Sequence, residues 1–177
     1  MARIPDINIT EGKIAYSNFS GSPTQYTPEG GKRSVTFVIP DDIADDLKNE
    51  GWPIREQKFD DGTSRYLLDA AFLFRTRNGQ PRDPKIFIVR DNRLIHVTEE
   101  TADTLDRADI VSVDAVIAAS YWEYAGRSGI KAYINSMYLT IKENPIDEKY
   151  RKMMEEVETA IPDISSDNDL DLPFPVE

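Results

Sequence analysis

The sequence has no cysteine and a single histidine, and these two shortages exclude several kinds of chemistry. Without thiols the chain can form neither a disulfide framework nor a thiolate metal site. With one imidazole it cannot form a multi-histidine metal centre, and a histidine-based catalytic triad would have to use that one residue. We expect that histidine, His96, to be structural, because it lies between Ile95 and Val97. Glycine-rich phosphate-binding motifs are also missing, so we predict no enzyme, no metal and no cofactor.

Long apolar runs are absent as well. No stretch approaches the roughly 20 apolar residues that span a bilayer. The N-terminus, Met-Ala-Arg-Ile-Pro-Asp, lacks the apolar segment of a signal peptide. Together with the lack of cysteine, these features predict a cytoplasmic protein with no membrane partner.

Basic residues are missing after Lys152, which makes the charge uneven. Residues 155–177 carry eight acids and no base, so residues 1–154 keep 24 acids and 21 bases, a net charge of -3. Between Arg55 and Arg93, nine bases outnumber six acids. Binding of a polyanion depends on the local potential, so the total charge of -11 does not exclude nucleic acid.

Alternating apolar residues separated by turn residues predict a mainly β protein with short inserted helices. Most strands are joined by hairpins, and no long helices alternate with them, which favours a small antiparallel barrel or sandwich. Short helices are expected near 41–50 and 98–107. The expected strands are 11–20, 34–39, 64–77, 85–90, 108–124 and 130–142, with a short extended piece at 52–58.

Several segments support a more specific interpretation. They are Asn18-Phe19-Ser20-Gly21, residues 40–47, Gly51-Trp52, Tyr121-Trp122-Glu123, residues 129–133 and Ser136-Met137-Tyr138. In order and spacing they resemble a family of phage and prophage single-stranded-DNA-binding proteins over roughly residues 6–150. The resemblance implies an OB-fold-like antiparallel β-barrel that coats single-stranded DNA during replication or recombination. We therefore expect an OB-fold domain at 1–144, a weak helix or linker at 145–160 and a disordered acidic tail at 161–177.

A single-strand binder needs aromatic faces for base stacking and cations along the phosphate backbone. In an OB-fold, ligands lie across the face of the second and third strands and on the loops after the first and fourth. Arg75 and Arg77 are expected to share a strand face and contact phosphates. Whether Trp122 and Tyr124, or Tyr121 with Glu123, face the DNA stays open. The predicted DNA-binding residues are Phe19, Tyr26, Lys32, Arg33, Arg75, Arg77, Arg82, Lys85, Tyr121, Trp122, Tyr124, Arg127, Lys131 and Tyr133.

The C-terminal tail gives a second resemblance, to the acidic tip of single-stranded-DNA-binding proteins that ends in Asp-Asp-Ile-Pro-Phe or a close relative. The resemblance implies that the tail binds replication or recombination proteins. The tail departs from the pattern because Pro-Val-Glu follows Phe174. The predicted partner-binding residues are Asp167, Asp169, Asp171, Leu172 and Phe174.

Three alternatives remain. The first is a protein-interaction module that binds a host factor, for example by mimicking DNA. The second is a structural virion protein. The third is a carboxylate-dependent nuclease, for which Asp69 and Asp114 are the mid-strand candidates. A groove lined by bases favours DNA binding, whereas bases scattered in ion pairs favour the interaction module. The sequence leaves open a homo-oligomer, the site size and the choice between DNA and RNA.

Overall fold

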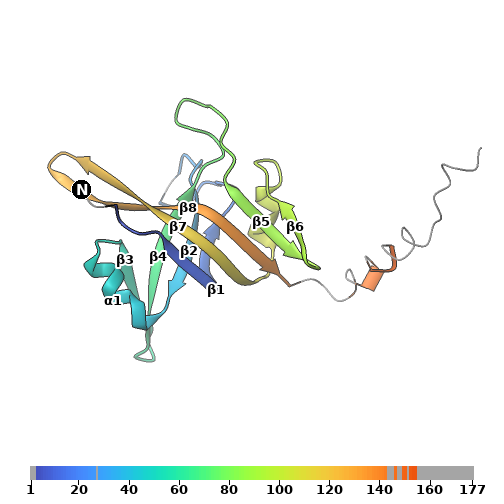
Figure 1. Ribbon diagram of the computed structural model, residues 1–177, viewed down its shortest axis with the longest axis horizontal. Helices are drawn as coiled ribbons and strands as arrows, with labels where there is room; N and C mark the ends of the chain where they lie inside the picture. Colours follow the sequence, from blue (N-terminus) through green and yellow to red (C-terminus); the bar gives the residue numbers. More distant parts are fainter. Residues whose placement is uncertain (1–2, 27, 143–145, 147–148, 151, 155–177) are drawn as a thin grey trace, which may run out of the picture. The chain divides into compact units, whose positions relative to one another are not determined.

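A computed structural model describes residues 3–26, 28–142, 146, 149–150 and 152–154. The chain divides after Lys142, and the two parts are treated separately. The first part contains eight strands, one α-helix and one 3-10 helix (Figure 1). These are β1 (Ile7–Asn18), β2 (Arg33–Ile39), α1 (Asp41–Asn49), β3 (Ile54–Lys58), β4 (Ser64–Phe72), β5 (Lys85–Arg90), β6 (Arg93–His96), η1 (Ala102–Arg107), β7 (Ile110–Tyr124) and β8 (Arg127–Ile141).

Five of these strands close into a ring. β1 pairs antiparallel with β2 and with β7, β2 pairs with β4, and β7 pairs with β8. A short parallel pairing between β4 and β8, at Ala70↔Ala132 and Ala71↔Tyr133, completes the circle. The order β1-β2-β4-β8-β7 gives the five-stranded Greek-key barrel of an OB-fold, so the predicted fold class is confirmed.

The remaining elements are insertions into this barrel. α1 and β3 lie between β2 and β4 in sequence, and β3 extends the sheet beyond β4. β5, β6 and η1 lie between β4 and β7, and β5 pairs in parallel with residues 136–140 of β8. β8 therefore pairs first with β4 and then with β5. The loop of residues 73–84 links these two strands beside β8, and Figure 1 shows it projecting from the barrel.

The core consists of the inward-facing side chains of the ring. Phe37, Phe72 and Ile117 are fully buried, as their alternation in the sequence predicts. Trp52 follows α1 and is buried as a cover of this core. Gly51, just beyond the helix, has a φ of 100°, the positive value that suits glycine after a helix C-terminus.

Several expected boundaries are wrong. The strand predicted for 64–77 ends at Phe72, because the chain turns at residues 76–80, where Thr76 N–H donates to Gln80 C=O at 2.8 Å. β6 was not predicted, since its four residues are all exposed and show no apolar alternation. The helix expected near 98–107 is a 3-10 helix that starts at Ala102.

In the second part, Ile146, Lys149, Tyr150 and residues 152–154 are helical, within the weak helix expected at 145–160. The predicted acidic tail, with Asp167, Asp169, Asp171, Leu172 and Phe174, lies outside the described residues. Among the helices that are described, none has the length and apolarity needed to cross a membrane.

Candidate functional site

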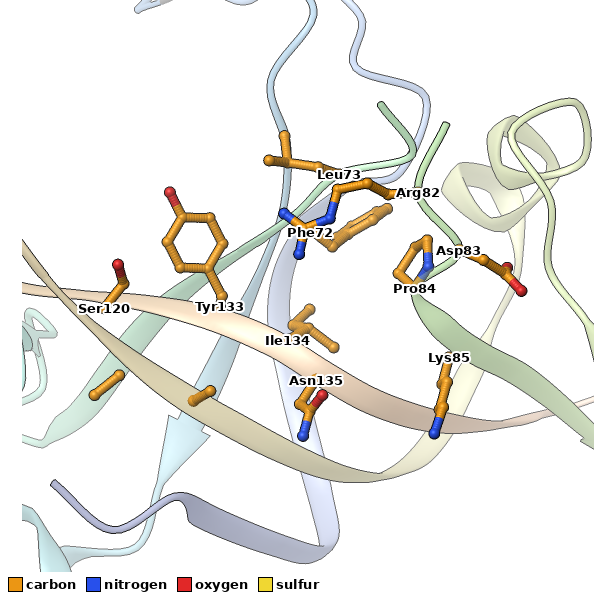
Figure 2. Close-up of a pocket in the computed structure, with 12 residues that line it drawn as sticks. Phe72, Leu73, Arg82, Asp83, Pro84, Lys85, Ser120, Tyr133, Ile134 and Asn135 are labelled. Atoms are coloured by element: carbon orange, nitrogen blue, oxygen red, sulfur yellow. The ribbon is translucent and has the colours of Figure 1, made fainter. Parts of the chain in front are cut away.

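A cavity of about 480 Å³ opens beside β8. Its walls come from β7, from β8 and from the loop of residues 73–84 together with the start of β5. Figure 2 shows the ring of Tyr133 projecting from β8 on the side where Arg82 and Leu73 lie. Lys85 also lines the cavity. Three predicted DNA-binding residues, Arg82, Lys85 and Tyr133, are therefore brought together.

A second cavity of about 240 Å³ shares Leu73 and Tyr133 with the first. It lies over β2, β4 and β8 and adds Lys32, Arg33 and Lys131 to the lining. Leu73 and Tyr133 line both cavities, so the two cavities adjoin, and we call them together the β8 groove. Its principal side chains are Lys32, Leu73, Arg82, Lys85, Lys131 and Tyr133.

The β8 groove presents cations that are not neutralised by neighbours. Within the described residues, Lys32, Arg82, Lys85 and Lys131 form no ion pair. The two acids that line the groove are both engaged elsewhere. Asp83 Oδ1 lies 2.8 Å from His96 Nε2, and Asp69 pairs with Arg55 at 3.1 Å and accepts a hydrogen bond from Thr36. The net local charge is therefore positive.

The groove also offers apolar surface. Tyr133 is half-buried, and the ammonium of Lys131 lies 5.2 Å from its ring centroid. Leu73 is exposed beside it. A ring next to an unpaired cation can bind a nucleobase and a phosphate of the same nucleotide.

Arg33 lines the groove, but its guanidinium already contacts other residues of the protein. Its Nη1 donates to the Phe19 carbonyl at 2.5 Å, and its guanidinium lies 4.9 Å from the Phe74 ring centroid. These contacts anchor the loop between β1 and β2, and the DNA contact predicted for Arg33 stays a prediction.

Phe19 is a clear correction. It was expected to stack on a base, but its side chain is 0% exposed and packs on Phe72 at a centroid distance of 5.9 Å. Asp106 on η1 explains this placement, because its carboxylate accepts hydrogen bonds from the backbone N–H groups of Phe19 and Ser20 at 2.7 and 3.1 Å. These bonds fix the start of the loop so that the ring enters the core.

Arg75 and Arg77 do not share a strand face, because β4 ends before them. Arg75 forms an ion pair with Glu99 at 3.0 Å and donates to the carbonyl of Gly79. Arg77 is exposed in the loop and lines neither cavity of the groove. The shared strand face expected of them is therefore wrong, and their contact with DNA stays a prediction.

Two flanking elements carry the remaining predicted residues. Tyr26 lies in the loop between β1 and β2 and is 85% exposed. At the tip of the β7–β8 hairpin, Tyr121, Trp122, Tyr124 and Arg127 are all exposed. Both faces of the hairpin thus carry accessible aromatic rings. The exposure of these side chains therefore does not show which face contacts DNA.

The sequence did not single out a cluster on the outer face of β4. Arg65 lies between the rings of Tyr16 and Phe59, and Gln57 bonds to both Tyr16 and Arg65. The alternation of 64–72 placed Arg65 on the outward face, but the aromatic partners come from β1 and from the turn after β3. Only the β1-β2-β4-β3 order brings them together.

The two carboxylates proposed for a nuclease are bonded to other groups of the protein. Asp69 is held by Arg55 and Thr36, and Asp114 accepts the Glu11 N–H at 2.7 Å. In the part of the chain that the structure describes, no group of three or more histidine, aspartate or glutamate residues could hold a metal ion.

Comparison with known families matches residues 1–173 to the family described as "Putative phage ssDNA-binding domain". Among solved structures, the chain is similar to the single-stranded DNA-binding protein from bacteriophage Enc34. The C-terminally truncated form has 15% identity and a TM-score of 0.48, and the match covers 79% of this chain and 87% of that one. The form in complex with ssDNA has 14% identity and a TM-score of 0.48, covering 79% and 88%. No curated protein matches this chain.

Proposed function

The chain belongs to the family of putative phage ssDNA-binding domains, and from this membership we propose that it is a non-enzymatic protein that binds single-stranded DNA in the β8 groove. The observation that supports this site is that four cations without an ion pair among the described residues line, with Tyr133 and Leu73, two adjoining cavities. The groove lies over β2, β4 and β8, and β2 and β4 are the second and third barrel strands, the face on which OB-folds bind ligands.

The roles of the groove residues follow from their chemistry. Lys32 and Lys131 on one side, and Arg82 and Lys85 on the other, attract the phosphate backbone and release its counterions. Tyr133 offers its ring to a base, and stacking on an aromatic residue contributes roughly 1–3 kcal/mol per base. Every base has an aromatic face, so this mode of binding is largely independent of sequence.

The flanking elements extend the path of the strand. Tyr26 stands on the loop between β1 and β2, and Trp122, Tyr124 and Arg127 stand on the β7–β8 hairpin. These are the loops after the first and fourth barrel strands, where OB-folds contact their ligands. We assign them to additional stacking and phosphate contacts on longer strands.

In the cell, such a protein would coat single-stranded DNA during phage replication or recombination in the host cytoplasm. The acidic tail, from Asp167 to Phe174, would recruit replication or recombination enzymes. A flexible chain of about 20 residues would span on the order of 25 Å, at about 5–6 Å × √n. The tail would then also compete with DNA for the cations of the groove.

The alternative of a protein-interaction module predicts bases that are consumed in ion pairs. Arg55 and Arg75 fit that expectation, since each pairs with a carboxylate. Among the described residues, Lys32, Arg82, Lys85 and Lys131 do not, and they are the cations that gather in the groove. Their arrangement supports DNA binding over the alternative.

The test is a fluorescence-anisotropy titration of a labelled oligo-dT of about 30 nucleotides, roughly two to eight times the site of one OB-fold. It is run at two salt concentrations, with duplex DNA of equal length as competitor. We expect tight binding that weakens with salt and is poorly competed by duplex. Deletion of residues 163–177 should tighten binding, most strongly at low salt. Absence of binding both with and without these residues would refute the proposal.

A further inference from the structure

The outer face of the β3–β4 hairpin carries a second aromatic and cationic cluster. The guanidinium of Arg65 lies 5.7 Å from the ring centroid of Tyr16 and 5.3 Å from that of Phe59. Gln57 connects Tyr16 and Arg65 by hydrogen bonds. Its Nε2 donates to the Tyr16 hydroxyl at 2.7 Å, and its Oε1 accepts from Arg65 Nε at 2.7 Å. We call Tyr16, Gln57, Phe59 and Arg65 the Arg65 platform.

The rings of the platform are fixed yet open to solvent. Tyr16 is 48% exposed and Phe59 43% exposed. Leu67, two residues after Arg65, is fully buried although it alternates with Leu68 and so faces away from the barrel core. Because the hydrogen bonds already restrict Tyr16 and Arg65, a ligand that stacks there has little side-chain entropy to remove.

The platform lies on the same face as the β8 groove. Arg65, Leu67, Asp69 and Ala71 alternate along the outward side of β4, and Asp69 and Ala71 line the second cavity of the groove. Six residues separate Ala71 from Arg65, a distance of roughly 20 Å along the strand. Arg55, from β3, lies between them and holds the Asp69 carboxylate at 3.1 Å.

Arg65 supplies the platform with a cation, and it makes no ion pair within the described residues. Lys58 and Asp60, one base and one acid, are both exposed and flank Phe59 in the sequence. The nearby Asp61 is occupied inside the turn, since its carboxylate accepts from the backbone N–H and the hydroxyl of Thr63 at 2.9 and 2.6 Å.

We propose that the Arg65 platform is a second stacking site for single-stranded DNA, reached only by strands long enough to leave the β8 groove along β4. Bases stack on Phe59 and Tyr16, while Arg65 contacts a phosphate. This inference rests on the proposed function of the groove. The bound strand would then follow a path over the surface from β8, across β4, to the β3–β4 turn.

The test compares two lengths of oligo-dT: about 6 nucleotides, near the lower end of the roughly 4–16 that one OB-fold covers, and about 20, beyond the upper end. The variant combines Phe59→Ala with Arg65→Gln. The matched control combines Leu94→Ala with Arg93→Gln on β6, where both residues are exposed. We expect the platform variant to raise the Kd for the long strand about tenfold, as for the loss of one stacked base, and to leave the Kd for the short strand within about twofold. The control should change neither.

A third variant, Tyr16→Phe, keeps the ring and removes the hydroxyl that Gln57 orients, and it should weaken long-strand binding less than the double variant. Thermal unfolding verifies that each variant folds. Equal binding of the long strand by the platform variant and the wild type overturns the inference, as does an equal loss for both lengths. If the wild type binds neither length, the proposed function itself fails, which is a distinct result.

Discussion

The ammonium of Lys131 lies 5.2 Å from the ring centroid of Tyr133, two residues further along β8. Alternation along the strand puts both side chains on one face, and that face lines the second cavity of the groove. This pair brings a cation and an aromatic ring within reach of one nucleotide, at the point where β8 pairs with β4.

The first prediction concerns this pair. Tyr133→Ala should weaken binding of oligo-dT by roughly 1–3 kcal/mol, the contribution of one stacked base. Lys131→Gln should weaken it less at high salt than at low salt, because its contribution is electrostatic. Anisotropy titrations measure both, with Arg93→Gln on β6 as the control that leaves affinity unchanged. If the Tyr133→Ala protein binds oligo-dT with unchanged affinity, the DNA binds elsewhere on the protein.

The second prediction concerns the opposite wall of the groove. Arg82→Gln and Lys85→Gln should each lower the slope of log K against log salt by about 0.7, the value for one phosphate contact on a single strand. The measurement is a salt titration of the binding constant. A substitution at Arg75 should alter this slope less, since that side chain already pairs with Glu99. Equal slopes in the wild type and the Arg82 and Lys85 variants would exclude both residues from the backbone path.

The third prediction separates two aromatic residues that flank the same loop. Phe19→Ala should lower the free energy of unfolding by about 3–5 kcal/mol, the cost of emptying a phenylalanine site in a core. Tyr26→Ala should leave unfolding nearly unchanged and weaken DNA binding. Chemical denaturation and anisotropy give the two readouts. The opposite pattern, with a stable Phe19→Ala protein, would contradict the burial of that ring.

Phe19 and Tyr26 also show how far the sequence can be interpreted. Both stand beside polar loop residues, and only the carboxylate of Asp106, 87 positions further along the chain, turns Phe19 inward. The five-stranded barrel was predictable, since its strands alternate and Phe37 and Phe72 mark the inward faces. The groove was not, because it needs β8 to pair in parallel with β4 and then β5. Parallel pairings between distant strands leave no local pattern.

The basic residues show the same limit of prediction from the sequence, because the sequence does not reveal which of them form ion pairs. Lys32, Arg82, Lys85 and Lys131 were candidates from the sequence, and they line the two cavities of the groove; their contact with DNA stays a prediction. Arg75 had the same sequence context, and its partner Glu99 is 24 residues away. The Arg65 platform was missed because its two rings come from separate segments, Tyr16 from β1 and Phe59 from the turn after β3, and Arg65 lies on a third segment, β4.

The fourth prediction concerns the Tyr16 hydroxyl. Hydrogen bonds from Gln57 and then Arg65 hold the pKa of Tyr16 below its usual value of 10.0, because they favour the ionised form. Gln57→Ala should therefore raise this pKa toward the usual value. Absorbance titration of tyrosinate, with Tyr16→Phe as the reference that isolates one of eight tyrosines, measures it.

The lowered pKa of Tyr16 also predicts how the stability of the protein depends on pH. A lowered pKa in the folded state adds stability above the unfolded value of 10.0, and this contribution disappears as the pH falls through the folded pKa. Tyr16→Phe should thus lose stability relative to the wild type mainly at alkaline pH. If the Tyr16 titration does not change in the Gln57→Ala variant, the hydrogen-bonded platform is contradicted.

The most direct measurement of the central claim is a map of amide chemical-shift changes when oligo-dT is added to the full-length protein. The account predicts that the largest changes fall at residues 31–33, 73–85 and 131–135, which surround the β8 groove. Changes that are confined to β6 and η1, on the inserted elements, with none in these three segments, would contradict it.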